Sequence, residues 1–251
     1  MTLEGKRALV TGGGSGLGAA IALALAEAGA EVFVSGRRAS ALEEISARSE
    51  RISPIVADVT KEDSLREMFA EIAKGGAPDI VIANAGAAES APFHRTDRDL
   101  WQRMLDVNLT GVFLTFQAAM PLMKTNPNGR LIAIASTAGL KGYSYMSAYT
   151  AAKHGVVGLV RALAHEVATT GLTVNAICPS FTETPMLERS IENIIEKTGK
   201  SREYAMKALS SGNPQGRFIR PEEVAGTVLW LCGPDAGSVT GQAISISGGE
   251  I

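Results

Sequence analysis

The sequence predicts an α/β fold in which a doubly wound, parallel seven-stranded sheet carries helices on both faces. Seven short apolar runs alternate with longer helical stretches along the 251 residues. The runs are apolar at consecutive positions, which is typical of strands that are buried on both faces of a parallel sheet. Right-handed crossovers then place the intervening helices on both faces. We expect a single domain, because α/β folds of about 250 residues are common.

The N-terminal half supplies four strands and three helices. Apolar runs predict strands at residues 7–11, 31–35, 52–58 and 79–83. The stretches between them predict helices at residues 17–28, 39–50 and 62–74. Gly29 directly follows the first helix, as expected of a residue that ends helices.

The C-terminal half supplies three strands and three longer helical stretches. Strands are predicted at residues 130–135, 173–177 and 243–246. Helices are predicted at residues 97–123, 147–168 and 221–231. Pro221 stands in the first turn of the last helix, where its missing N–H costs nothing.

Residues 184–220 interrupt this alternation. The segment carries many charges with only intermittent apolar residues. It follows the end of a predicted strand, which is where doubly wound sheets bind ligands. We interpret it as two short helices that form a substrate lid; a surface insertion is the alternative.

Composition excludes several classes of protein. Lys plus Arg number 24 and Asp plus Glu 26, so the net charge of −2 favours neither nucleic acid nor an anionic membrane as a partner. Cys178 and Cys232 cannot build a disulfide framework, and no motif predicts a metal site. The uncharged residues 8–26 are interrupted by glycines, which excludes a membrane span or a signal peptide. We therefore expect a cytoplasmic protein.

A glycine-rich loop lies between the first strand and the first helix. Glycines there let the backbone approach a pyrophosphate, and the helix N-terminus offers free N–H groups to it. This position predicts a dinucleotide site. The cofactor-binding residues expected in the loop are Gly12, Ser15, Gly16, Leu17 and Gly18.

Together with Thr11, the loop resembles the TGxxxGxG motif of the short-chain dehydrogenase/reductase family. Further family motifs follow in order: Asn84-Ala85-Gly86, Asn108, Ser136, and Tyr149 with Lys153. Tyr149 follows Ser136 by 13 residues, the family's usual spacing. The resemblance covers nearly the whole chain. It implies a Rossmann-like fold and a nicotinamide-dependent interconversion of a ketone and a secondary alcohol.

The expected catalytic residues are Asn108, Ser136, Tyr149 and Lys153. Tyr149 and Lys153 are four residues apart on one helix and therefore share a face. The Lys153 ammonium and an oxidised nicotinamide ring favour the phenolate, so Tyr149 can exchange a proton with the substrate oxygen. Ser136 can hydrogen-bond the same oxygen. The resemblance implies that Lys153 holds the nicotinamide ribose and that Asn108 supports a proton-relaying water.

The resemblance also assigns further residues to the cofactor: Asp58, Val59, Asn84, Ala85, Gly86, Tyr149, Lys153, Pro179, Thr182 and Thr184. The chain departs from the family at one position, since Ser180 replaces the usual glycine after Pro179. This departure concerns the local geometry near the nicotinamide.

The end of the second strand predicts the cofactor. NAD enzymes of this architecture usually place an acidic residue there to bind the ribose 2′-OH. Here Gly36 takes that place and Arg37 follows, and a guanidinium can bind a 2′-phosphate bidentately. NADP(H) is therefore favoured; NAD(H) is the alternative if Arg37 is a solvated turn residue.

The lid offers two signals about the substrate, each with two interpretations. Its apolar side chains suit either an acyl substrate or packing within the lid: Met186, Leu187, Ile191, Ile194 and Ile195. Its basic side chains suit either a carrier phosphopantetheine or CoA, or a solvated helix face: Arg189, Lys197, Lys200, Arg202 and Lys207.

Residues 154–186 look especially like polyketide and β-ketoacyl reductases, and also like 3-hydroxyacyl-CoA and secondary-alcohol dehydrogenases. The leading hypothesis is an NADP(H)-dependent enzyme that acts on a 3-oxoacyl thioester or a polyketide-like ketone. The alternatives are an NAD-dependent 3-hydroxyacyl-CoA or alcohol dehydrogenase, and a non-catalytic NADP(H)-binding regulator. The complete set of catalytic residues argues against the regulator. The resemblance implies a homotetramer.

Overall fold

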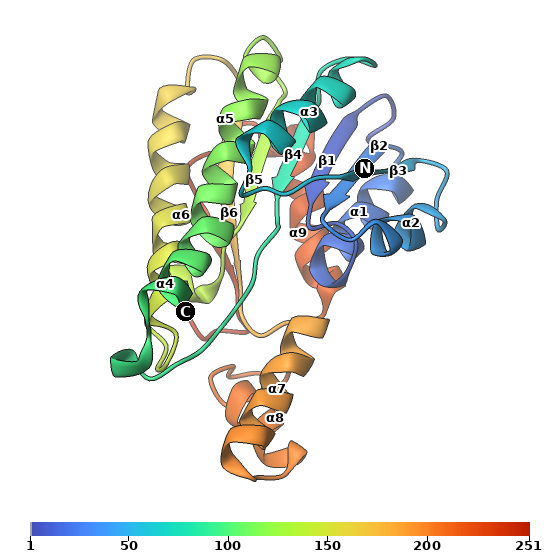
Figure 1. Cartoon of the computed structure of the whole chain (residues 1–251). Coiled ribbons are helices and arrows are strands. Elements are labelled where there is room, and N and C mark those ends of the chain that lie inside the picture. The colour runs from blue at the N-terminus through green and yellow to red at the C-terminus, as the bar shows by residue number, and fades with distance from the viewer. Residues whose placement is uncertain (1) are drawn as a thin grey trace.

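The computed structural model describes residues 2–251 and shows a sheet of seven parallel strands in the order β3-β2-β1-β4-β5-β6-β7 (Figure 1). Their bounds are Arg7–Thr11 (β1), Glu31–Gly36 (β2), Ile52–Val56 (β3), Ile80–Ala83 (β4), Arg130–Ile134 (β5), Thr173–Pro179 (β6) and Ala243–Ile246 (β7). The chain builds outward from β1 to β3 and then returns to the other side of β1 with β4. The strand order therefore reverses between β1 and β4, where sheets of this type bind ligands. The predicted doubly wound fold is confirmed.

Burial explains which apolar runs became central strands. Every residue of β4, β5 and β6 is buried, as the runs without alternation predicted. In the edge strand β3 only Ile52 is buried, and the strand contains the exposed Pro54, which an edge tolerates. β3 is also shorter than predicted. Asp58 accepts hydrogen bonds from Thr60 instead of continuing the strand.

Helices cover both faces of the sheet. Their bounds are Gly16–Glu27 (α1), Ala39–Ser46 (α2), Glu62–Ala73 (α3), Arg98–Leu105 (α4), Gly111–Met123 (α5), Ser147–Glu166 (α6), Pro185–Thr198 (α7), Arg202–Ser210 (α8) and Pro221–Cys232 (α9). One hydrophobic core lies between the sheet and α3, α5 and α6. The other lies between the sheet and α1, α2 and α9.

The predicted helix over residues 97–123 is interrupted. A π-helical turn, Asp106–Thr110 (η2), separates α4 from α5. It carries Asn108, whose amide donates hydrogen bonds to Met104 O and Ala87 O at 3.0 and 2.9 Å. Helical periodicity cannot show such an insertion, because the flanking residues keep their apolar pattern. π-turns often occur at functional sites.

One smaller difference concerns the end of α2, whereas the 184–220 segment agrees with its prediction. α2 ends at Ser46 rather than at residue 50, and the Ser46 hydroxyl donates to Ile52 O at 2.6 Å. The 184–220 segment forms the two expected helices, α7 and α8, which project from the body (Figure 1). Thr184 and Ser201 cap their N-termini, and Gly199 ends α7 in the left-handed conformation.

Candidate active site

The glycine loop is joined to the end of β4. The Thr11 hydroxyl oxygen accepts hydrogen bonds from Asn84 N and Ala85 N at 3.0 and 3.1 Å. The Asn84 side-chain amide donates to Thr11 O and Gly12 O at 2.9 and 3.2 Å. The Thr11–Gly12 and Asn84–Ala85 motifs, 73 residues apart, therefore form one unit at the position where the strand order reverses.

The loop has the shape that a pyrophosphate requires. Gly12 has a φ of +65°, and a Cβ there would lie 2.8 Å from Ala85 Cα. A Cβ on Gly18 would clash with Gly12 O. The Ser15 side chain does not cap α1, and the first turn of α1 contains no acidic residue. The N–H groups of this turn are therefore not engaged by Ser15 and can face an anion. Gly12, Ser15, Gly16, Leu17 and Gly18 thus fit a dinucleotide phosphate.

Two arginines lie at the end of β2. Arg37 is exposed, and its charge helps to lower the pKa of Asp58: burial acts to raise this pKa, but hydrogen bonds from Thr60 and the charges of Arg37 and Lys61 outweigh it. Arg38 donates a hydrogen bond to Ser15 Oγ at 3.3 Å. Arg38 was not among the predicted cofactor residues, although it directly follows Arg37 in the sequence.

The four expected catalytic residues come from three elements. Ser136 follows β5, Asn108 lies in η2, and Tyr149 and Lys153 stand on α6. Lys153 is 3% exposed, donates to Ile134 O at 2.8 Å, and lies 5.7 Å from the Tyr149 ring centre. Gly86 packs closely against this group: a Cβ on Gly86 would lie 2.9 Å from Asn108 Oδ1 and 3.8 Å from Lys153 Nζ.

Burial controls the charges of this group. It raises the pKa of Tyr149 above the usual range, and a hydrogen bond with Ser136 opposes the shift. It lowers the pKa of Lys153 to about 8. Desolvation disfavours both charges, so the protein's own groups favour a neutral Tyr149. That Lys153 and an oxidised nicotinamide ring together favour the phenolate stays a prediction. A neutral Tyr149 is suited to donating a proton.

The loop after β6 approaches both groups. Pro179 O lies 3.5 Å from Ser136 Oγ. The hydroxyls of Thr182 and Thr184 donate to Ser180 O and Thr182 O at 2.9 and 3.1 Å, which folds the loop. A Cβ on Gly16 would lie 3.3 Å from Thr184 Cβ, so α7 begins beside the glycine loop. Val59 is buried against Gly111, the first residue of α5.

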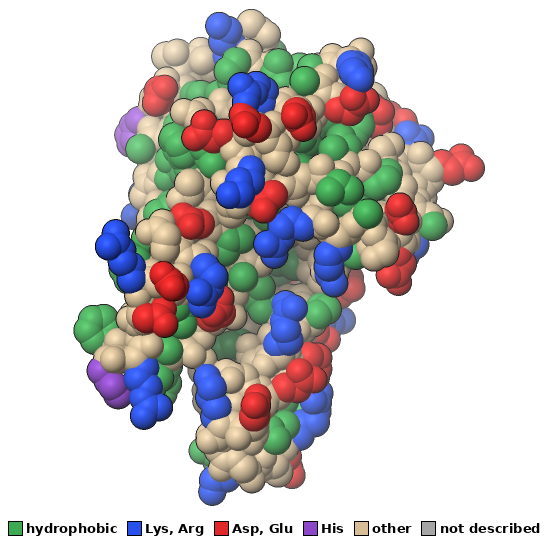
Figure 2. Space-filling view, in the orientation of Figure 1, with side chains coloured by type: hydrophobic (Ala, Val, Ile, Leu, Met, Phe, Trp, Pro, Cys, Tyr) green, Lys and Arg blue, Asp and Glu red, His purple; other side chains and the backbone are tan. Residues whose placement is uncertain are grey.

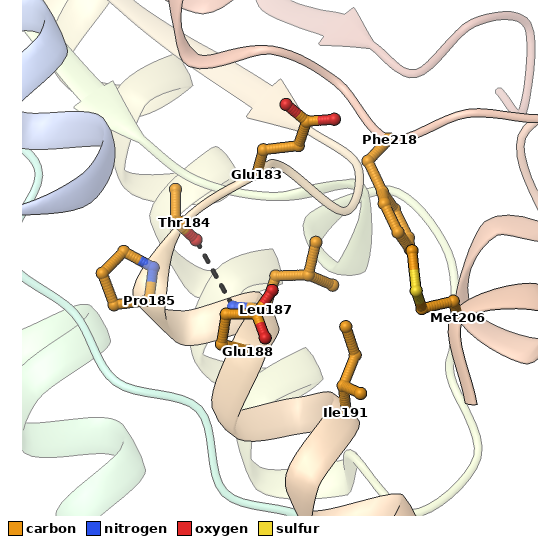
Figure 3. A pocket seen from close by; sticks show the side chains of 8 residues that line it. All are labelled: Glu183, Thr184, Pro185, Leu187, Glu188, Ile191, Met206 and Phe218. Atoms are coloured by element: carbon orange, nitrogen blue, oxygen red, sulfur yellow. Dashed lines mark hydrogen bonds between the residues drawn. The ribbon is translucent and has the colours of Figure 1, made fainter. Parts of the chain in front are cut away.

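The projecting α7 and α8 have a hydrophobic core of their own. Leu187 and Ile191 are buried with Ala205 and Phe218, and Ile194 and Ile195 pack around them. This supports packing within the segment for those residues. A cavity of about 410 Å³ beside this core is lined by Glu183, Thr184, Pro185, Leu187, Glu188, Ile191, Met206 and Phe218 (Figure 3).

The surface is hollowed between α7–α8 and the body, and charges of both signs are interspersed around it (Figure 2). Asn193 and Lys197 of α7 donate hydrogen bonds to Ser90 Oγ and Ser90 O at 3.2 and 3.4 Å. Arg202 forms an ion pair with Glu188 at 2.7 Å. Lys197 and Arg202 are thus engaged within the protein.

Residues 2–251 contain no cluster of three or more His, Cys, Asp or Glu side chains placed to hold a metal. None of their helices is long and apolar enough to cross a membrane.

Comparisons with known proteins agree with this geometry. Residues 12–250 match the family model described as enoyl-(acyl carrier protein) reductase. The chain is 37% identical to the D-beta-hydroxybutyrate dehydrogenase of Rhizobium meliloti over 97% of its length and 98% of the relative's. It is 36% identical to the 3-oxoacyl-(acyl-carrier-protein) reductase of Thermotoga maritima over the full length of both. A crystal structure of a variant actinorhodin polyketide ketoreductase with NADPH superposes with a TM-score of 0.94, at 35% identity, over 98% of this chain and 97% of that one.

Proposed function

The chain belongs to the short-chain dehydrogenase/reductase family, and from this premise we propose that it is an NADP(H)-dependent ketoreductase acting on a 3-oxoacyl thioester or a polyketide-like ketone. The observation that carries the proposal is the gathering of Asn108, Ser136, Tyr149 and Lys153 next to a glycine loop that fits a dinucleotide phosphate. The polyketide ketoreductase and the 3-oxoacyl reductase among the relatives support the substrate class.

Each residue of the group has a role that its position suits. Tyr149, held neutral by burial, donates its proton to the carbonyl oxygen, and Ser136 hydrogen-bonds the same oxygen. Lys153 holds the nicotinamide ribose. Asn108 supports a water that returns a proton to Tyr149. NADPH, when bound, supplies the hydride to the carbonyl carbon.

The remaining cofactor contacts are also proposals. Asp58 and Val59 contact the adenine, and Asn84, Ala85 and Gly86 line the ribose side. Pro179, Thr182 and Thr184 frame the nicotinamide. Arg37, together with Arg38, binds the 2′-phosphate, since the Arg38 guanidinium lies beside Ser15 of the glycine loop and the charge of Arg37 acts on Asp58 at the end of the neighbouring strand.

Arrangement and location complete the proposal. The chain is one domain with residues 184–220 as its substrate lid, in the cytoplasm. It forms a homotetramer, which the exposed Trp101 and Phe113 of α4 and α5 and Trp230 of α9 support. Light scattering coupled to gel filtration measures the mass of the assembly.

The cofactor preference is tested by titrating the protein with NADPH and NADH and following nicotinamide fluorescence. We expect NADPH to bind at least about tenfold more tightly, because two guanidinium groups face the 2′-phosphate. The preference should fall in Arg37→Ala and in Arg38→Ala, with NADH affinity unchanged. A preference for NADH would favour the alternative, an NAD-dependent hydroxyacyl dehydrogenase, which the similarity to D-beta-hydroxybutyrate dehydrogenase supports.

The reaction is tested by mixing NADPH with 3-oxoacyl thioesters and cyclic ketones and following absorbance. Turnover of either class supports a ketoreductase. Tight NADPH binding without turnover of any ketone would instead support the regulator.

A further inference from the structure

The penultimate residue, Glu250, is a buried carboxylate with three donors. Its side chain is 3% exposed. Its Oε1 accepts from Lys141 Nζ and from the Tyr143 hydroxyl, both at 2.7 Å. Its Oε2 accepts from Ser180 Oγ at 2.5 Å. Burial acts to raise the pKa of Glu250, but these three hydrogen bonds outweigh it and the pKa is lowered, so the carboxylate stays charged near neutral pH.

The donors stand on the two segments that leave the reacting centre. Lys141 and Tyr143 follow Ser136 in the loop after β5, and Ser180 follows Pro179 at the end of β6. Because Tyr143 has one hydroxyl proton and donates it to Glu250, the Thr137 hydroxyl donates to Tyr143, at 2.7 Å. A continuous chain of hydrogen bonds therefore leads from Glu250 to the residue next to Ser136.

The Glu250 carboxylate also lies beside Gly212, in the segment that leads from the end of α8 back to α9. A Cβ on Gly212 would lie 2.7 Å from Glu250 Oε1. The Tyr143 ring packs edge-to-face on Phe181, with ring centres 6.3 Å apart. Phe181 in turn packs against the core of α7 and α8. Glu250 and its donors thus lie where three segments meet: the loop after β5, the loop after β6, and the base of the projecting helices α7 and α8.

We propose that Glu250 is a positioning residue. Through its hydrogen bonds with Lys141, Tyr143 and Ser180, it holds Ser136 and the base of the lid in the positions that the ketone requires. The proposal rests on the proposed function, since it concerns the same reaction. The proposal also assigns a role to Ser180, whose hydroxyl donates to Glu250; a glycine at this position has no hydroxyl to donate. The C-terminal residues are then part of the substrate side of the site.

The contacts indicate which kinetic constants should change. The hydrogen bonds of Glu250 lead to Ser136 and to the substrate side, whereas the glycine loop is held by Thr11 and Asn84. Loss of the carboxylate leaves three donors without their acceptor, and the loop after β5 must rearrange to find others. Carbonyl binding and turnover should suffer, and cofactor binding should not.

The experiment measures kcat and KM for a ketone and the Kd for NADPH in Glu250→Ala, Glu250→Gln and Ser180→Gly. We expect Glu250→Ala to lower kcat/KM for the ketone about 10- to 100-fold, with the Kd for NADPH within about twofold of the wild type. Glu250→Gln should recover part of the loss, because its carbonyl oxygen still accepts one or two of the hydrogen bonds. Ser180→Gly should cost much less in the Glu250→Ala background than in the wild type. Glu27→Gln, at the exposed end of α1, is the matched control for loss of a carboxylate.

The outcomes separate this inference from the function on which it rests. A wild-type protein that reduces no ketone contradicts the proposed function. An active wild type with unchanged kcat/KM in Glu250→Ala overturns the inference alone. An equal loss of ketone turnover and NADPH affinity also overturns it, since that indicates general unfolding. If Glu250→Ala does not fold, Tyr143→Phe removes the hydrogen bonds of Tyr143 with Thr137 and Glu250, and Ser180→Ala removes the one from Ser180 to Glu250; the same split between kcat/KM and the Kd decides.

Discussion

The cofactor cradle and the substrate side of the site are built by different means. The cradle, residues 11–18 with 84–86, is made largely of backbone and glycines, joined by the side chains of Thr11 and Asn84, and several of its glycines have no room for a Cβ. The substrate side, residues 137–143 and 180–220 with the C-terminus, is made of side chains that meet across distant segments. A steric constraint admits one residue type, whereas a side-chain cluster can be rebuilt with others. We therefore expect the cradle to be intolerant of change and the substrate side to set specificity.

The largest effect should come from Tyr149, where the two regions meet. Tyr149→Phe removes the proton donor and should lower kcat by about 10²–10⁴-fold, the range for general acid catalysis. The Kd for NADPH should stay unchanged, because the cradle is untouched. Steady-state kinetics and fluorescence titration measure the two constants. Tyr145→Phe, an exposed residue nearby, is the control. A fall in both constants would show that the two regions are not separable.

The cradle is tested directly by Gly12→Ala. The residue has a φ of +65° and lies against Ala85, so a Cβ must strain the loop. At about 1–3 kcal/mol of strain, the Kd for NADPH should rise about 10- to 100-fold. Gly226→Ala in α9, where a Cβ meets nothing within 4 Å, should leave NADPH binding unchanged. Tolerance of Gly12→Ala would contradict the steric account of the cradle.

The substrate side should respond through KM. Ile191 is buried in the core shared by α7 and α8, and Ile191→Ala should cost about 2–4 kcal/mol of local stability. We expect faster proteolysis within residues 184–220 and a higher KM for the ketone, with NADPH affinity retained. Met206→Ala, at a more exposed position, should have little effect. An unchanged KM would favour a surface insertion over a lid.

The smallest effect should come from the ion pair between Arg217 and Glu223, which joins the 184–220 segment to α9 at 2.7 Å. Hydrogen bonds from the Arg217 side chain and the Arg220 backbone lower the pKa of Glu223 to about 2. The stabilisation is present above about pH 4.3, the ordinary glutamate pKa, and is lost as the pH falls towards 2. Both side chains are largely solvated, so the effect on stability is modest.

Thermal unfolding of the wild type and Glu223→Gln at pH 7 and pH 2.5 tests this pair. The Tm difference should be small at pH 7 and smaller still at pH 2.5. An equal difference at both values would show that the charge of Glu223 is not responsible.

Local patterns predicted most of the framework. Continuous apolar runs identified every strand, because burial on both faces of a parallel sheet leaves no alternation. The glycine loop, Ser136, Tyr149 and Lys153 were recognised from motif spacing, and the structure brings them to one edge of the sheet. The loop was recognised from its residue types and their spacing, although the groups that a Cβ at Gly12 or Gly16 would meet, Ala85 and Thr184, lie far away in sequence.

Other features depended on contacts that no local pattern contains. The π-turn around Asn108 arises because its amide reaches Ala87 O, 21 residues away. Burial by the whole fold raises the pKa of Tyr149, and this burial cannot be deduced from local spacing. The Arg38 guanidinium reaches Ser15, 23 residues away, only in the folded chain.

The sequence by itself determined the strand pattern, and it supplied the glycine loop and the side chains that we propose to react, because these depend on residue type and short-range spacing. Tertiary structure alone decided how the substrate side is held together. Glu250 meets Ser180 across 70 residues and Tyr143 across 107, and only folding brings such groups within hydrogen-bond distance. A carboxylate near the end of the chain carries no local signal, and its three donors become its partners only when burial removes water as an alternative.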